Sequence, residues 1–150
     1  PLIVAYGNTL RTDDGLGPLA AERLAVDPRV GGATVIARHQ LTLDLVIDMH
    51  EASVVVFIDA SHDLAPGAIA VQDVTTQAAD VGPWSHQVSA AALVALTAAL
   101  YGTTPSAVLV SMGVASVEAG DRPSPVVHAA LPALVDAVVE VIGSRVPSHA

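Results

Sequence analysis

The run VVVFI at residues 54–58, followed directly by Asp59, constrains the fold most. A strand that is apolar at every position is typical of a parallel sheet covered by helices on both faces. Further short runs at 2–6, 33–37 and 107–112 predict three more strands of the same kind. We therefore expect an α/β sandwich with a mostly parallel sheet.

Apolar residues recur at helical spacing between these runs, which predicts helices that connect parallel strands. The expected helices start near Asp14 and run to 24, cover 41–50, run from Ser85 to Leu100, and run from Ser124 to about Ile142. Ser85 and Ser124 are the expected N-caps, and Pro125 stands at the first helical position. Residues 68–71, after a Pro-Gly turn, are expected to form an edge strand. Residues 1–150 contain no repeat or linker and are expected to form one domain.

Charge and composition exclude several functions. The net charge is −9 with only six Lys and Arg, so no basic surface is expected to bind nucleic acid. Without cysteine, the chain has no disulfide, thiolate nucleophile or zinc–thiolate site, and any metal must be bound by oxygen and imidazole. No apolar run approaches the roughly 20 residues of a membrane helix. With no secretion signal, we expect a cytoplasmic protein that does not act on membranes.

Three candidate functional residues are expected at one edge of the sheet, because function collects at the carboxyl ends of parallel strands. The first strand leads into a loop that contains Asp13 and Asp14, and the 54–58 strand ends at Asp59. His86 is expected in the first turn of its helix, where the positive helix end favours neutral, metal-binding imidazole. One of Asp13 and Asp14, together with Asp59 and His86, would supply two oxygens and one nitrogen to a divalent transition metal.

Each of these residues also has a purely structural interpretation. One of Asp13 and Asp14 is expected to cap the following helix, which leaves the other free. Asp59 could bond neighbouring backbone amides, and His86 could simply occupy a helical turn. His39 ends the second strand and could border the same cleft.

Several common catalytic and binding motifs are missing. The chain has no G-x-G-x-x-G, no Walker lysine and no G-x-S-x-G elbow, which counts against nucleotide binding and serine hydrolase chemistry. Ser85 and His86 are adjacent, and adjacent helical side chains point apart, so a Ser–His dyad is not supported.

Four segments, in order, resemble the hydrogenase maturation endopeptidases. GNTLRTDDGLG at 7–17 resembles the signature G-N-x-L-x-x-D-D/E-G-x-G, and VFIDA at 56–60 resembles the strand that ends in D-A. SHQ at 85–87 resembles the segment that opens a helix, and SVEAGDRPSPVV at 116–127 resembles the closing segment. The resemblance covers nearly the whole chain.

This resemblance implies a three-layer α/β fold with a twisted, mainly parallel sheet, and a cytoplasmic, aspartyl-type peptidase. Such an enzyme removes the C-terminal extension of a nickel-loaded nickel–iron hydrogenase large-subunit precursor. It implies Asp14, Asp59 and His86 as metal ligands, with nickel supplied by the substrate, and Asp14 and Asp59 as catalytic residues. Asn8 and Gln40 are the expected substrate contacts, and a monomer is expected. HQLT at 39–42 stands where several members of the family carry D-G-G-T, and it resembles the branch serving soluble hydrogenases.

Two mechanisms are compatible with these residues. Nickel either acts as a Lewis acid beside an Asp14 or Asp59 base, or only identifies a correctly loaded precursor. A function of another class is a non-catalytic chaperone that binds the nickel-loaded precursor. A nucleotide-binding domain is a third hypothesis, which the missing phosphate loop disfavours.

Overall fold

The computed structural model describes residues 1–75 and 88–146, which form a five-stranded sheet of order β2-β1-β3-β5-β4. The strands are β1 (Leu2–Tyr6), β2 (Thr34–Arg38), β3 (Val54–Pro66), β4 (Ile69–Asp73) and β5 (Ser106–Gly113). All pair in parallel except β4, which pairs antiparallel with β5 at the edge. The expected mostly parallel sheet with an added edge strand is confirmed.

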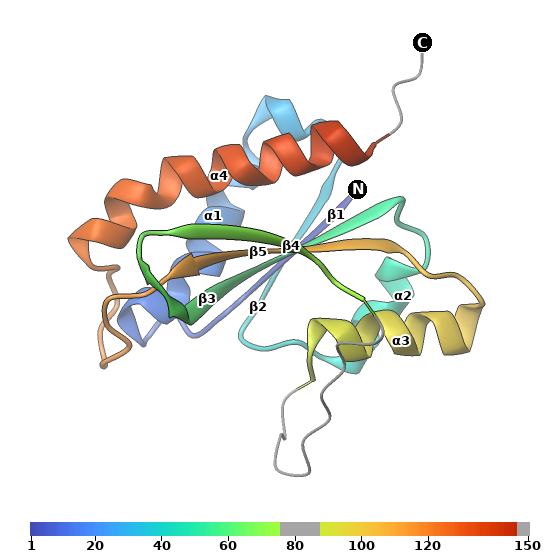
Figure 1. The fold of residues 1–150 in the computed structure, drawn as a ribbon, viewed down its shortest axis with the longest axis horizontal. Helices are drawn as coiled ribbons and strands as arrows, with labels where there is room; N and C mark the ends of the chain where they lie inside the picture. The colour runs from blue at the N-terminus through green and yellow to red at the C-terminus, as the bar shows by residue number, and fades with distance from the viewer. Residues whose placement is uncertain (76–87, 147–150) are drawn as a thin grey trace.

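Helices cover both faces of this sheet. They are α1 (Leu16–Ala25), α2 (Val46–Met49), α3 (Ala90–Tyr101) and α4 (Pro125–Arg145), with short 3-10 turns η1 (Thr12–Gly15), η2 (Pro28–Val30) and η3 (Leu43–Leu45). Helices α1 and α4 lie on one face, and α2 and α3 lie on the other (Figure 1). The expected α/β class and three-layer architecture are therefore confirmed.

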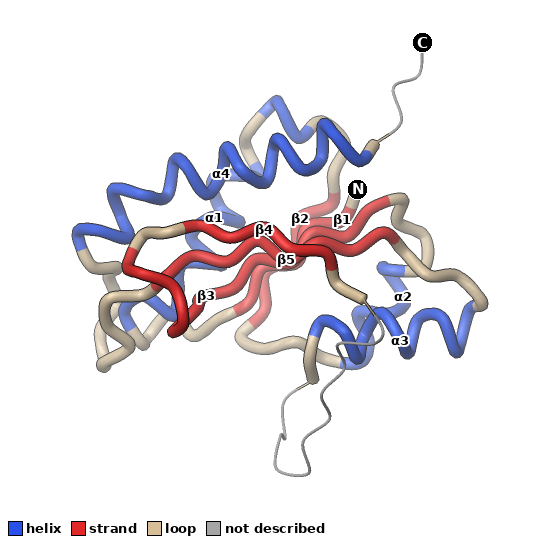
Figure 2. Tube along the Cα trace, viewed as in Figure 1, coloured by secondary structure: helices blue, strands red, loops and turns tan. Residues whose placement is uncertain are grey.

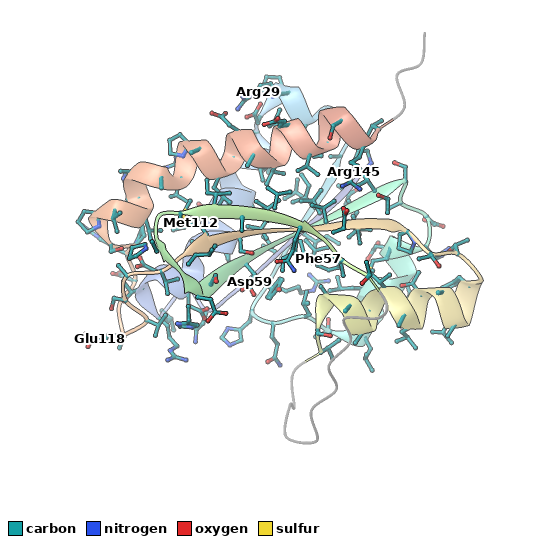
Figure 3. The ribbon with its side chains drawn as sticks, viewed as in Figure 1. Arg29, Phe57, Asp59, Met112, Glu118 and Arg145 are labelled. Carbon is teal, nitrogen blue, oxygen red and sulfur yellow. The ribbon has the colours of Figure 1, made fainter. Side chains whose placement is uncertain are left out.

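The central strands are apolar on both faces because each face packs against helices. Val56 and Met112 belong to the core beneath α1 and α4, whereas Val55 and Phe57 belong to the core beneath α2 and α3. Phe57 and Met112 are fully buried, and both are labelled in Figure 3. This double burial explains why residues 54–58 contain no polar side chain.

The two helical layers cover the sheet unequally. Helices α1 and α4 extend along their face, whereas α2 and α3 lie beneath only one half of the other (Figure 2). The second core accordingly contains the early positions of the strands, such as Leu2, Val55 and Ala107. Tyr6 and Asp59 lie further along the same strands and are only partly buried. Among the residues that the structure describes, this face is therefore less covered near the carboxyl ends of β1 and β3.

Helix α3 begins later than expected. Its first residue is Ala90, and its N-cap is Ser89, whose Oγ accepts a hydrogen bond from the Ala92 N–H at 3.0 Å. The predicted start at Ser85 was wrong, because α3 begins at Ala90. Ser85 and Ser89 are four residues apart, about one helical turn, so the apolar stripe has nearly the same phase from either start. His86 itself lies outside the described residues.

Helix α4 is longer than expected, with 21 residues that continue through Pro132. By length and composition alone it could cross a membrane, so the expectation that no apolar segment approaches that length was wrong. Its buried side chains, such as Leu131 and Val138, belong to the core that it shares with α1 and the sheet. This packing accounts for its apolar composition.

Candidate functional site

Asp59 lies where β1 ends, although β3 itself continues. The pairing of β1 with β3 stops at Ala5 opposite Ile58, and on the other side Asp59 pairs with Ser111 of β5. The prediction that this strand ends at residue 58 was wrong, because β3 runs on to Pro66 beside β5. Asp59 nevertheless lies at the carboxyl end of β1, because that neighbouring strand ends at Tyr6.

The Asp59 carboxyl group has too few polar partners to offset its burial fully. Burial raises its pKa to about 6, although hydrogen bonds with the Tyr6 hydroxyl and the Ala60 N–H lower it. The nearby Asp14 carboxylate raises this pKa further, and His62 lowers it. A pKa close to neutrality is the value expected of a group that accepts and returns a proton at working pH.

Asp14 reaches the same region from the loop after β1. Its carboxylate accepts a hydrogen bond from the Asn8 N–H at 3.0 Å, which closes the loop on itself. Gly7 permits this closure because its φ is +151°, and a side chain at Gly7 would collide with the Asp14 carbonyl. Gly7, the first glycine of the 7–17 motif, is thus required by the turn that presents Asp14.

Asp13, next to Asp14, has a different role. It is fully buried, and its carboxylate accepts hydrogen bonds from the Ala115, Ser116 and Ser124 N–H groups and from the Ser124 hydroxyl, at 2.6–3.0 Å. Burial alone would raise the pKa of Asp13, but these hydrogen bonds outweigh it and hold the pKa below its ordinary value. Asp13 therefore connects the loop after β1 to the start of α4.

Neither aspartate caps the helix that follows, so that expectation was wrong. The N-cap of α1 is Gly15, and the N-cap of η1 is Arg11, in both cases without a side-chain cap bond. The η1 turn separates Asp13 and Asp14 from α1, and each carboxylate finds its donors elsewhere. Ser124 is the N-cap residue of α4, as expected, but its hydroxyl bonds to Asp13 instead of its own helix.

Backbone contacts reinforce the link between the first and last motifs. The Thr12 N–H donates to the Gly120 carbonyl at 3.0 Å, and the Gly120 N–H donates to the Leu10 carbonyl at 2.9 Å. The Arg11 side chain donates to the Val117 carbonyl at 3.2 Å. Glu118, labelled in Figure 3, belongs to the same clamped loop and accepts from the Thr12 hydroxyl. The position of Asp14 is thereby fixed by segments about 100 residues apart.

Asp14 and Asp59 line one cavity of about 300 Å³. Gln40 lines it as well, and so does His39, as expected from its place after β2. The remaining lining residues are Tyr6, Gly7, Arg11, Leu41, Ala60, His62 and Val88. Asn8 is not among them, and its side-chain oxygen accepts from the Leu10 N–H at 2.9 Å. The structure thus brings Asp14, Asp59 and Gln40 together and leaves Asn8 in the adjoining turn.

Tyr6 and His62 were missed as site residues by sequence reasoning. Tyr6 ends β1 directly beside Asp59, and its phenol pKa is raised by burial and then by the Asp59 carboxylate. His62 lies three residues after Asp59 on the same strand. The signal for Tyr6 was available, because the last residues of neighbouring parallel strands lie side by side.

Within residues 1–75 and 88–146, no cluster of three His, Asp or Glu side chains is arranged to hold a metal ion. The described part of the site supplies two carboxylates, Asp14 and Asp59, which suit a metal only with further ligands. The expected third ligand, His86, belongs to the segment that is not described. The geometry therefore supports a carboxylate pair in an open cavity.

No protein-family model matches the sequence, and no curated protein matches it either. Solved structures with the same fold include the hydrogenase maturating endopeptidase HybD from E. coli, with a TM-score of 0.77 and 22% identity over 95% of this chain and 91% of HybD. The NiFe hydrogenase maturation protease HycI from Thermococcus kodakarensis KOD1 has a TM-score of 0.73 and 21% identity, over 95% and 91% of the two chains. A hydrogenase 2 maturation peptidase from a Thaumarchaeota archaeon has a TM-score of 0.71 and 23% identity, over 95% of this chain and 97% of the peptidase. The chain thus has the fold of these maturation proteases along almost its whole length.

Proposed function

We propose that this chain is a hydrogenase maturation endopeptidase that removes the C-terminal extension from a nickel-loaded large-subunit precursor. The observation that carries this proposal is the convergence of Asp14 and Asp59 on one cavity, in the fold of proteins named as hydrogenase maturation proteases. We place the reaction in the cytoplasm and assign it to a monomer. Both assignments belong to the proposal.

Asp59 is the proposed general base. Its pKa of about 6 leaves it mostly ionised at neutral pH and still basic enough to accept a proton from water. The water so activated would attack the scissile carbonyl, and the proton would then pass to the leaving amine. Asp14 is the second catalytic carboxylate, because it lines the same cavity and is held in place by the Asn8 N–H.

The proposed nickel contacts are Asp14, Asp59 and His86. Carboxylate oxygen and imidazole nitrogen suit nickel, and the precursor would bring the ion as part of the substrate. When bound, nickel would supply Lewis acidity at the scissile carbonyl or serve only to identify a loaded precursor. Two carboxylates in an open cavity favour a site that borrows the ion over one that retains it.

Gln40 is the proposed substrate contact on the β2 side of the cavity, where it lies beside His39. An amide both donates and accepts hydrogen bonds, so Gln40 is able to bind the backbone of an extended peptide. Asn8 is a further proposed contact from the turn that precedes Asp14. Replacement of Gln40 is therefore expected to raise KM more than it lowers kcat.

The test is incubation of the purified chain with nickel-loaded precursor, followed by measurement of the precursor's intact mass. Asp59→Ala is expected to reduce the rate by about 10²–10⁴-fold, the usual contribution of a general base. The matched control is Asp63→Ala, because Asp63 is an exposed carboxylate on the same strand. Full activity of Asp59→Ala would remove Asp59 from the mechanism. An unchanged precursor mass with a stable complex would instead establish the non-catalytic chaperone.

A further inference from the structure

A second cavity, of about 350 Å³, extends from Asp59 along the open face of the sheet. It runs away from the His39–Gln40 side and toward the edge strand β4. Its lining residues are Tyr6, Asp59, Gln72, Asp73, Val74, Val88, Ser89, Ala90, Ala91 and Leu109. They come from β1, β3, β4, β5 and the start of α3.

The two cavities meet at the Tyr6–Asp59 pair. Tyr6, Asp59 and Val88 line both of them, so the Asp59 carboxyl group borders two spaces at once. Any polypeptide cleaved beside Asp59 must continue on both sides of the reacting carbonyl. With an extended length of about 3.3 Å per residue, a few residues of substrate would span the two cavities.

The second cavity has an apolar floor and small walls. Leu109 of β5 pairs with Phe57 of β3 on one side and with Gln72 of β4 on the other. This position is two residues before the pair that Asp59 forms with β5. Ala90 and Ala91 contribute methyl groups from the first turn of α3. Among the described lining residues, and apart from the Tyr6–Asp59 boundary, polar side chains come mainly from the exposed end of β4. These walls suit a small or medium aliphatic side chain, which gains from burial.

From this geometry, and on the basis of the proposed function, we propose a second substrate subsite. The cavity between the end of β4 and the start of α3 binds an aliphatic side chain of the precursor, next to the cleaved bond. The His39–Gln40 cavity binds the part of the precursor on the opposite side of that bond. Asp59, which separates the two subsites, then faces the bond to be broken.

Gln72→Trp tests this subsite, because Gln72 is exposed and lines the cavity, so that a larger side chain would occupy it without disturbing the core. The matched control is Val71→Trp, the adjacent exposed position of β4, which does not line this cavity. With nickel-loaded precursor, Gln72→Trp is expected to raise KM about tenfold or more with little change in kcat. Val71→Trp is expected to leave both constants within about twofold of wild type.

Leu109→Ala gives a complementary test, since it enlarges the same cavity. Precursors in which each residue flanking the cleaved bond is replaced by Trp would be processed by wild type and by Leu109→Ala. The variant is expected to tolerate Trp better than wild type at one position, on one side of the bond only. Circular dichroism of every variant separates loss of binding from loss of folding.

Outcomes of these tests separate this proposal from the proposed function. One outcome is that wild type cleaves the precursor while Gln72→Trp leaves KM unchanged and Leu109→Ala tolerates Trp no better than wild type. The subsite is then wrong, and the protease assignment stands. If wild type does not cleave, a synthetic peptide spanning the processing point is titrated into ¹⁵N-labelled protein. Shifts at Gln72, Ala91 and Leu109 would then support the subsite as a peptide-binding site, and unchanged spectra would overturn it.

Discussion

Asp13 is a buried and Asp59 a partly buried aspartate at the same end of the sheet, and they differ in the number of hydrogen-bond donors that reach them. Asp13 accepts four hydrogen bonds from residues 115, 116 and 124, and its pKa lies below the ordinary value. Burial raises the pKa of Asp59 to about 6, and the Tyr6 hydroxyl and the Ala60 N–H offset this rise only in part. Hydrogen bonds from the protein offset the burial of the Asp13 carboxylate fully, whereas those that reach the Asp59 carboxylate offset its burial only in part.

This difference separates Asp13, which holds two segments of the fold together, from Asp59, the proposed general base. A buried carboxylate with a full set of donors stays ionised and holds its surroundings in place. A buried carboxylate with few donors retains affinity for a proton or a cation, and such groups cluster at functional sites. Asp59 also borders both cavities, whereas Asp13 lines neither of them. The four predictions that follow test this contrast.

The largest effect is expected from Asp13→Ala. The substitution leaves the N–H groups of Ala115, Ser116 and Ser124 without their acceptor, which is expected to cost about 3–5 kcal/mol in the free energy of unfolding. Urea unfolding at pH 7 measures it, with the exposed Asp121→Ala from the same loop as the control. A loss below about 1 kcal/mol would contradict the structural role.

The effect of Asp13 should also depend on pH in a defined direction. Its folded pKa lies below the ordinary value of 3.8, so its stabilisation is present above pH 3.8 and is lost as the pH falls through the folded pKa. The difference between wild type and Asp13→Ala should therefore be constant from pH 6 to pH 8 and become smaller below about pH 4.

An intermediate effect of opposite sign is expected from Asp59→Asn. The folded pKa of about 6 exceeds the ordinary 3.8, so wild-type stability is favoured at low pH and declines as the pH rises through 6. Removing this charge should stabilise the fold by about 1–3 kcal/mol at pH 8 and by almost nothing at pH 4. Urea unfolding at both pH values measures this, with Asp63→Asn as the control. An equal gain at both pH values would show that the charge is not responsible.

The smallest effect is expected from Tyr6→Phe. Loss of the phenol hydroxyl removes one of the few hydrogen bonds to ionised Asp59 and should destabilise the fold by about 0.5–1.5 kcal/mol at pH 8. The pKa of Asp59 should move above 6, which a ¹³C NMR titration of the carboxyl carbon reports. Tyr101→Phe, at an exposed position of α3, is the control. An unchanged Asp59 pKa would show that Tyr6 does not solvate this carboxylate.

Sequence reasoning placed Asp14, Asp59 and Gln40 at one edge of the sheet, because each follows or ends a strand-like run. It did not distinguish the two members of each of two pairs of identical residues. Ser85 and Ser89 are about one helical turn apart, so the apolar stripe did not show which of them caps α3. Asp13 and Asp14 are adjacent and chemically identical, so no local pattern showed which of them faces the cavity.

The sequence by itself determined the order of strands and helices, the parallel sheet and the approximate position of the acidic residues. These follow from periodicity and from burial on both faces, which act over a few neighbouring residues. Only the tertiary structure decided which aspartate receives a full set of hydrogen bonds and which has a raised pKa. The donors to Asp13 come from residues more than 100 positions away, and the phenol beside Asp59 comes from another strand. Contacts of that range are set by packing, because they form only when distant segments meet in the folded chain.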